Sequence, residues 1–156
     1  MSSEKNSSPN NSVPTFREYY DGTLYGALSW QQLAALWSKV TADSEADSGW
    51  YIYAVGQGVP ITTASKPLLQ RFISETDALL RRDHREDYCG IVYADDLEKP
   101  NFVKIFDPHK LGSSCGSSAN PPAPGWILSR VAPTEIKSKE IVPEQRKRWL
   151  AAIFQS

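Results

Sequence analysis

Cysteine is scarce in this sequence, with two residues in 156 positions. Two cysteines are too few for the disulfide frameworks that stabilise small secreted proteins, so we expect Cys89 and Cys115 to be free thiols in a reducing compartment. No segment approaches the roughly 20 consecutive apolar residues that cross a bilayer, and residues 1–13 contain no apolar run of the kind found in a signal peptide. The sequence therefore predicts a cytoplasmic protein without a membrane anchor.

Neither sign of charge dominates. Lys and Arg number 17 and Asp and Glu number 18, which gives a formal net charge of -1. A large positive field, which attracts the phosphates of nucleic acids, is therefore absent, and we expect no nucleic-acid partner. Apolar residues make up 40% and charged residues 22% of the chain, which is typical of a globular protein. We predict that residues 1–13 form a disordered N-terminal tail and that residues 14–156 form a single domain.

Apolar spacing and capping residues predict the order of secondary structure. Ser29 followed by Gln32 has the form of a capping box, and Ser65 with Pro67 marks the start of a second helix. The expected elements are a helical turn at 15–20, helices at 29–40, 65–80 and 143–154, and strands at 50–55, 88–94, 102–106 and 126–131. This order predicts an α+β fold, with an antiparallel or mixed sheet of about four strands and helices packed on one face.

Aromatic residues are expected on both faces of this sheet. Tyr53, Tyr93 and Phe102 lie in predicted strands, where successive side chains point to opposite faces. The predicted helices cover only one face readily. Since aromatic side chains in excess of one packed face are typical of interfaces, we expect the other face to bind another protein.

Two acidic residues, Asp95 and Asp96, lie between the predicted strands 88–94 and 102–106. Paired carboxylates can bind a hard cation or act as acid and base. Asp is also favoured in turns, because its carboxylate accepts local backbone hydrogen bonds. We interpret this pair as part of a hairpin connection.

The most unusual segment is the predicted loop 107–125, which begins DPHKLGSSCGSS. Backbone amides of small residues can converge on an anion or favour a thiolate. Cys115 is therefore a candidate nucleophile and His109 a candidate base. The candidate binding residues are Asp107, Lys110, Gly112, Ser113, Ser114, Gly116 and Ser117, together with Tyr93.

A simpler interpretation of this loop stays open. The glycines then serve turns, the serines hydrogen-bond to nearby amides, and Cys115 is a small, half-buried side chain. Known anion-binding patterns do not fit, because a phosphatase loop needs Arg six residues after the cysteine, where Pro121 stands. No Gly-Lys-Ser/Thr follows the glycines, so the loop is not a P-loop.

A metal site can be composed from two thiols and two imidazoles, those of His84, Cys89, His109 and Cys115. The spacing argues against zinc, because no two of these residues form the close pair that zinc sites use. We therefore expect neither a metal nor a cofactor.

Three stretches between residues 87 and 129 resemble a group of small bacterial proteins of uncharacterised function. They read DYCGIVYADD, IFDPHKLGSSCG and PGWILS and span about a quarter of the chain. Such proteins look like ones encoded near nitrogen-fixation genes, where accessory proteins handle or protect a larger enzyme. The resemblance implies an accessory role and assigns no role to any single residue.

Two functions follow from these observations. The first is a non-catalytic accessory or protein-binding domain that presents its sheet face and the loop 107–125 to a larger enzyme or complex. The alternative is a thiol-dependent enzyme with Cys115 as nucleophile and His109 as base.

Overall fold

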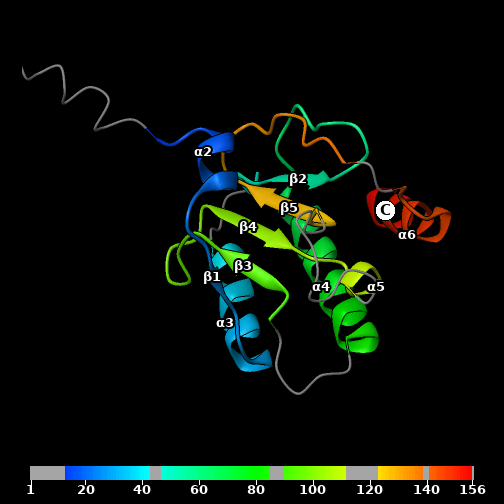
Figure 1. The fold of residues 1–156 in the computed structure, drawn as a ribbon, viewed down its shortest axis with the longest axis horizontal. Coiled ribbons are helices and arrows are strands. Elements are labelled where there is room, and N and C mark those ends of the chain that lie inside the picture. The colour runs from blue at the N-terminus through cyan, green and yellow to red at the C-terminus, as the bar shows by residue number, and fades with distance from the viewer. Residues whose placement is uncertain (1–12, 43–46, 85–89, 112–122, 139–140, 156) are drawn as a thin grey trace, which may run out of the picture.

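Five strands form one open antiparallel sheet in the computed structural model, which describes residues 13–42, 47–84, 90–111, 123–138 and 141–155 (Figure 1). The strands are β1 (Tyr25–Gly26), β2 (Tyr51–Ala54), β3 (Val92–Ala94), β4 (Phe102–Ile105) and β5 (Trp126–Ser129). Their order across the sheet is β1-β3-β4-β5-β2, and every neighbouring pair is antiparallel. The predicted α+β class is confirmed, and the strand that the sequence did not predict is β1.

In the described part of the chain, five helices accompany the sheet. They are α2 (Phe16–Asp21), α3 (Trp30–Val40), α4 (Lys66–Asp83), α5 (Pro108–Leu111) and α6 (Glu144–Phe154). The three longest confirm the predicted helices within a few residues. The short α5 occupies the start of the segment that was predicted to be a loop. No described helix combines the length and the apolar character that a bilayer span requires.

Local capping explains where α3 and α4 begin. The Ser29 hydroxyl accepts a hydrogen bond from the backbone N–H of Gln32 at 3.0 Å, and the Ser65 hydroxyl accepts one from the backbone N–H of Leu68 at 3.3 Å. The Gln32 side chain accepts from the backbone N–H of Leu28 at 2.7 Å, one residue before the cap. The predicted box at Ser29 is thus present with its second bond shifted by one residue.

The main core lies between one face of the sheet and the three long helices. In Figure 1, α3 and α4 lie behind the strands and α6 lies to one side. Strand residues alternate strictly, so that Ile52 and Ala54 face this core while Tyr53 points to the other side. The strand side chains that contribute to the core are Ile52, Ala54, Val92, Ala94, Val103, Ile105, Trp126 and Leu128.

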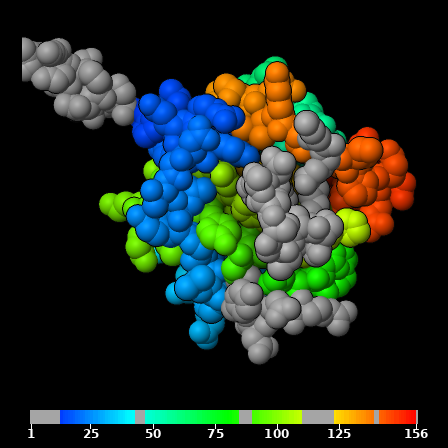
Figure 2. Space-filling model, viewed as in Figure 1, coloured from blue at the N-terminus to red at the C-terminus, as the bar shows by residue number. Residues whose placement is uncertain are grey.

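Among the described residues, α2 and the segment 131–138 cover part of the opposite face. Phe16 of α2 packs edge-on against Phe102 at 5.4 Å between ring centroids, and Tyr19 stacks on the same ring at 5.6 Å. The segment 131–138 adds Ile136 to this second cluster, next to the strand residue Tyr53. Figure 2 shows α2 in blue beside this segment in orange at the upper rim of the face. The prediction of one helix-covered face therefore holds for the long helices, whereas the short α2 packs on the other face.

The hairpin between β3 and β4 confirms the interpretation of the acidic pair as a turn. The Asp95 carboxylate accepts hydrogen bonds from the backbone N–H groups of Asn101 and Phe102 at 2.8 and 3.0 Å. The Asp96 carboxylate accepts from those of Glu98 and Lys99 at 2.8 and 3.0 Å. Both carboxylates thus organise the connection between the two strands.

Candidate functional site

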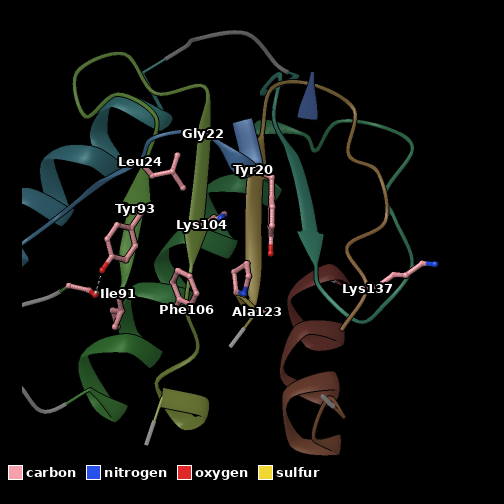
Figure 3. A pocket seen from close by; sticks show the side chains of 11 residues that line it. Tyr20, Gly22, Leu24, Ile91, Tyr93, Lys104, Phe106, Ala123 and Lys137 are labelled. Carbon is pink, nitrogen blue, oxygen red and sulfur yellow. Dashed lines mark hydrogen bonds between the residues drawn. The ribbon is translucent and has the colours of Figure 1, made fainter. Parts of the chain in front are cut away.

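A pocket of about 620 Å³ opens on the second face of the sheet, next to the part that α2 covers. Its walls come from five stretches of chain, namely α2 and the residues after it, β3, β4, the residues before β5, and the segment 131–138 (Figure 3). The lining residues are Tyr20, Gly22, Leu24, Gly90, Ile91, Tyr93, Lys104, Phe106, Ala123, Pro124 and Lys137. Most of them are apolar or aromatic, which is the usual character of a small-molecule site.

Tyr93 and Phe106 form one aromatic corner of the pocket. Their rings are nearly perpendicular, at 88° with 5.8 Å between centroids, which is a favoured edge-to-face arrangement. The Tyr93 hydroxyl donates a hydrogen bond to the carbonyl of Gly90 at 3.1 Å. Gly26 of β1 lies opposite Tyr93, and a Cβ at this glycine would stand only 2.9 Å from the ring. A residue without a side chain is therefore required where the ring crosses β1.

Lys104 places a cation on the wall of the pocket that β4 forms. It is the direct cross-strand partner of Tyr93, and the alternation of β4 places both side chains on the same face. Its ammonium nitrogen lies 3.8 Å from the centroid of the Tyr20 ring, at a distance typical of a cation–π contact. Among the described residues, no carboxylate forms a hydrogen bond or salt bridge with Lys104.

The surroundings of Lys104 shift its proton equilibrium. Burial lowers the pKa of the Lys104 ammonium, the nearby Asp21 carboxylate opposes this shift, and the Arg17 guanidinium reinforces it. Asp21 is itself paired with Arg17 at 3.3 Å, so its charge is partly compensated within α2. Burial also raises the pKa of the Tyr20 phenol. The site therefore holds a desolvated lysine beside a neutral aromatic ring.

Asp107 and His109, which were predicted to act in the loop 107–125, do not line this pocket. Asp107 is buried at 3% exposure, and its carboxylate accepts two hydrogen bonds from the Arg146 guanidinium, at 2.8 and 2.9 Å. The backbone N–H of His109 donates to the same carboxylate at 2.9 Å, while the His109 side chain is exposed. The structure thus assigns Asp107 to an ion pair that anchors α5 to α6.

Most other residues predicted for the loop fall outside the described part of the chain. Lys110 lies in α5, and its side chain is not among those described. The residues that lie outside the described part of the chain are Gly112, Ser113, Ser114, Cys115, Gly116 and Ser117. The pairing of Cys115 with His109 therefore stays a prediction. Of the predicted binding residues that the structure describes, Tyr93 alone lines the pocket.

Of the four candidate zinc ligands, the structure describes only His84 and His109. Within the described residues, no group of three His, Cys, Asp or Glu side chains is arranged to hold a metal ion. Cys89 and Cys115 lie outside them. His84 ends α4, with its backbone N–H donating to the carbonyl of Leu80 at 2.8 Å.

Lys104 was missed by reasoning from the sequence, although the sequence contains a signal for it. It is the one charged residue in the strand sequence FVKI, whose other members are buried. Charged residues inside a strand with two covered faces are unusual and point to a special environment. This signal was overlooked, because a lysine on a face that is expected to be open to solvent is not unusual.

Comparison of the chain with protein families, with curated proteins and with solved structures found no match. The chemistry of the pocket therefore follows from its own residues.

Proposed function

We propose that this chain is a non-catalytic binding protein whose pocket holds an apolar, ring-sized group that carries a negative charge. The observation that carries this proposal is the position of Lys104. Its ammonium lies over the Tyr20 ring in a pocket of about 620 Å³, with no carboxylate bonded to it among the described residues. A half-buried cation in such a place is a functional-site candidate, because an anion of the ligand can bond directly to a charge that no described carboxylate bonds.

The rest of the pocket fits the apolar part of such a ligand. Tyr93, Phe106 and Leu24 provide ring and hydrocarbon surfaces around the lysine (Figure 3). Burying an apolar ring against these surfaces contributes roughly 25 cal/mol for each Å² removed from water. The apolar walls thus provide affinity, and Lys104 selects for charge at one end of the ligand.

This proposal retains the accessory-protein hypothesis in a specific form. An accessory protein that acts on a larger enzyme presents such a pocket to an acidic or aromatic group of its partner. The resemblance of residues 87–129 to proteins encoded near nitrogen-fixation genes suggests where to look for that partner. The sheet face, rather than the loop 107–125 alone, is the proposed contact surface.

Two matched fluorescent probes test the proposal. The anionic probe 8-anilinonaphthalene-1-sulfonate and its neutral analogue N-phenyl-1-naphthylamine share the same rings and differ in the sulfonate. We expect the anionic probe to bind at one site, and the neutral probe to bind more weakly. A charge-assisted contact contributes about 1.5–3 kcal/mol, which corresponds to a difference of roughly ten-fold or more. Both affinities are measured by fluorescence titration.

Substitution of the lysine makes this test specific. We expect Lys104→Met to weaken the anionic probe by roughly ten-fold and to leave the neutral probe nearly unchanged. The control is Lys147→Met, which removes the same charge from an exposed position on α6. Thermal unfolding of both variants verifies that they fold. Equal affinity of Lys104→Met and the original protein for the anionic probe would show that the proposal is wrong.

A further inference from the structure

The side-chain amine of Lys104 can react in two ways. As an ammonium it attracts an anion, and as a free amine it is a nucleophile. In the pocket, Tyr20 of α2 lies on one side of the amine and Tyr93 of β3 lies directly across the strand pair. A lysine that is desolvated in a hydrophobic pocket is the usual form of an activated amine.

We propose that Lys104 also condenses with an aldehyde that carries an apolar ring, so that the pocket is a covalent aldehyde site. This inference rests on the proposed function only in requiring that the pocket admit a ring-sized group. The aldehyde oxygen enters beside the lysine, and the ring of the aldehyde occupies the corner formed by Tyr93 and Phe106.

The reaction balances without an oxidant or a reductant. The lone pair of the Lys104 nitrogen attacks the carbonyl carbon, and a proton passes from nitrogen to oxygen to give a carbinolamine. The nitrogen lone pair then expels the hydroxyl group as water, with one proton taken up by the oxygen and one lost from the nitrogen. The product is an imine between the aldehyde carbon and the lysine nitrogen, and water is the only other product.

The charged and titratable groups around Lys104 determine how this reaction depends on pH. α2 contributes Arg17, Tyr20 and Asp21, while β3 contributes Tyr93. The segment 131–138 contributes Lys137, whose side chain extends away from the other lining residues in Figure 3. Burial outweighs the opposing Asp21 carboxylate, so the pKa of Lys104 is lowered and a larger fraction is free amine at neutral pH than for an exposed lysine.

Reductive trapping of the imine tests this inference on the full chain. The protein is incubated at pH 7 with 6-methoxy-2-naphthaldehyde and sodium cyanoborohydride, which converts the imine into a stable secondary amine. Peptide mapping by mass spectrometry then compares labelling among the nine lysines. We expect Lys104 to be labelled roughly ten-fold faster than Lys147, because the pocket holds the aldehyde next to the amine. This preference is expected to decrease as the pH is raised toward 10, where exposed lysines also lose their protons.

Two variants show whether the adduct forms on the amine of Lys104. Lys104→Arg keeps the positive charge but has no amine that can form the imine, so the dominant adduct must disappear. Lys147→Met must leave it in place. The N-terminal amine, which is partly unprotonated at pH 7, serves as an internal reference for the reactivity of an exposed amine.

The results separate this inference from the proposed function. Even labelling of all lysines, together with binding of the anionic probe that depends on Lys104, overturns the aldehyde site and leaves the proposed function intact. Even labelling without any binding that depends on Lys104 overturns both. A dominant adduct at Lys104 that excess 8-anilinonaphthalene-1-sulfonate suppresses supports both.

Discussion

Asp107 is a buried charged side chain and Lys104 a half-buried one, and they differ in how their charge is compensated. The Asp107 carboxylate binds the Arg146 guanidinium through two hydrogen bonds, and Arg146 also donates to Asp83 at 3.1 Å. Lys104 is left with the face of the Tyr20 ring. A fully paired charge of the first kind holds two elements together, whereas the second kind is available to a ligand.

Removing one charge of the Asp107–Arg146 pair is expected to destabilise the protein strongly. Asp107→Asn leaves the guanidinium of Arg146 buried at 6% exposure, with Asp83 as its remaining recorded carboxylate. We expect the free energy of unfolding to fall by about 3 kcal/mol, measured by urea denaturation. Glu98→Gln is the control, because the Lys39–Glu98 pair is exposed and little change is expected there. Similar losses in both variants would contradict the structural role given to Asp107.

The segment 131–138 shows how a stretch without helix or strand is positioned by side chains from regular elements. The hydroxyl of Tyr53 on β2 accepts a hydrogen bond from the backbone N–H of Ile136 at 2.9 Å, in a buried environment. The Ser129 hydroxyl at the end of β5 bonds to both the backbone N–H and the carbonyl of Val131, at 3.1 and 2.7 Å. These bonds hold the segment against the sheet, where it forms one wall of the pocket.

Loss of the Tyr53 hydroxyl is expected to loosen this segment. Tyr53→Phe leaves the buried N–H of Ile136 without its acceptor, which costs about 1–3 kcal/mol of unfolding free energy. Urea denaturation measures this loss, and hydrogen exchange is expected to be faster at the amide of Ile136. The matched change Tyr51→Phe, at a half-buried position on the same strand, is expected to have a small effect. If both variants exchange and unfold alike, the hydroxyl does not hold the segment.

The molecule as a whole is built on a sheet whose two faces are covered by different elements. The three long helices seal one face, and α2 with the segment 131–138 covers part of the other, leaving the pocket beside β3 and β4. The connections around this sheet depend on ionised aspartates. Hydrogen bonds from Arg82 and Arg146 lower the pKa of Asp83, and backbone N–H groups of Lys99 and Glu98 lower that of Asp96.

Acid is therefore expected to destabilise the fold. A carboxyl whose pKa is lower in the folded than in the unfolded protein stabilises the fold above its unfolded pKa, and this contribution is lost as the pH falls through the folded value. Asp47, whose pKa is lowered by the backbone N–H of Gly49 and the hydroxyl of Thr63, follows the same rule. We expect the urea midpoint to fall as the pH decreases below about 4.

The pH profile of a variant tests whether protonation of these aspartates causes the loss of stability in acid. Asp83→Asn removes one of the carboxyls that titrate, so its stability is expected to be lower at pH 7 and to depend less on pH in the acid range. A urea midpoint that stays constant down to pH 3 in the original protein would contradict the assignment.

Much of the secondary structure was predictable because its signals are local. Ser29 and Ser65 cap helices through hydrogen bonds that span three residues, and apolar spacing shows which helix face is buried. The strand β1 was not predictable, because Tyr25–Gly26 has no local strand signal and is defined by its pairing with β3. In the candidate site, Tyr93 was selected from its strand, whereas Lys104 required knowledge of what covers the second face.

The amino-acid sequence by itself determined the three long helices, the helical turn of α2, four of the strands and the α+β class, because each depends on residues that are near one another along the chain. Only the tertiary structure decided that Tyr20, Tyr93 and Lys104 meet in one pocket and that Asp107 is bound to Arg146. These contacts join residues that are 11 to 84 positions apart. Strand register and helix packing, rather than any local pattern, place such residues side by side.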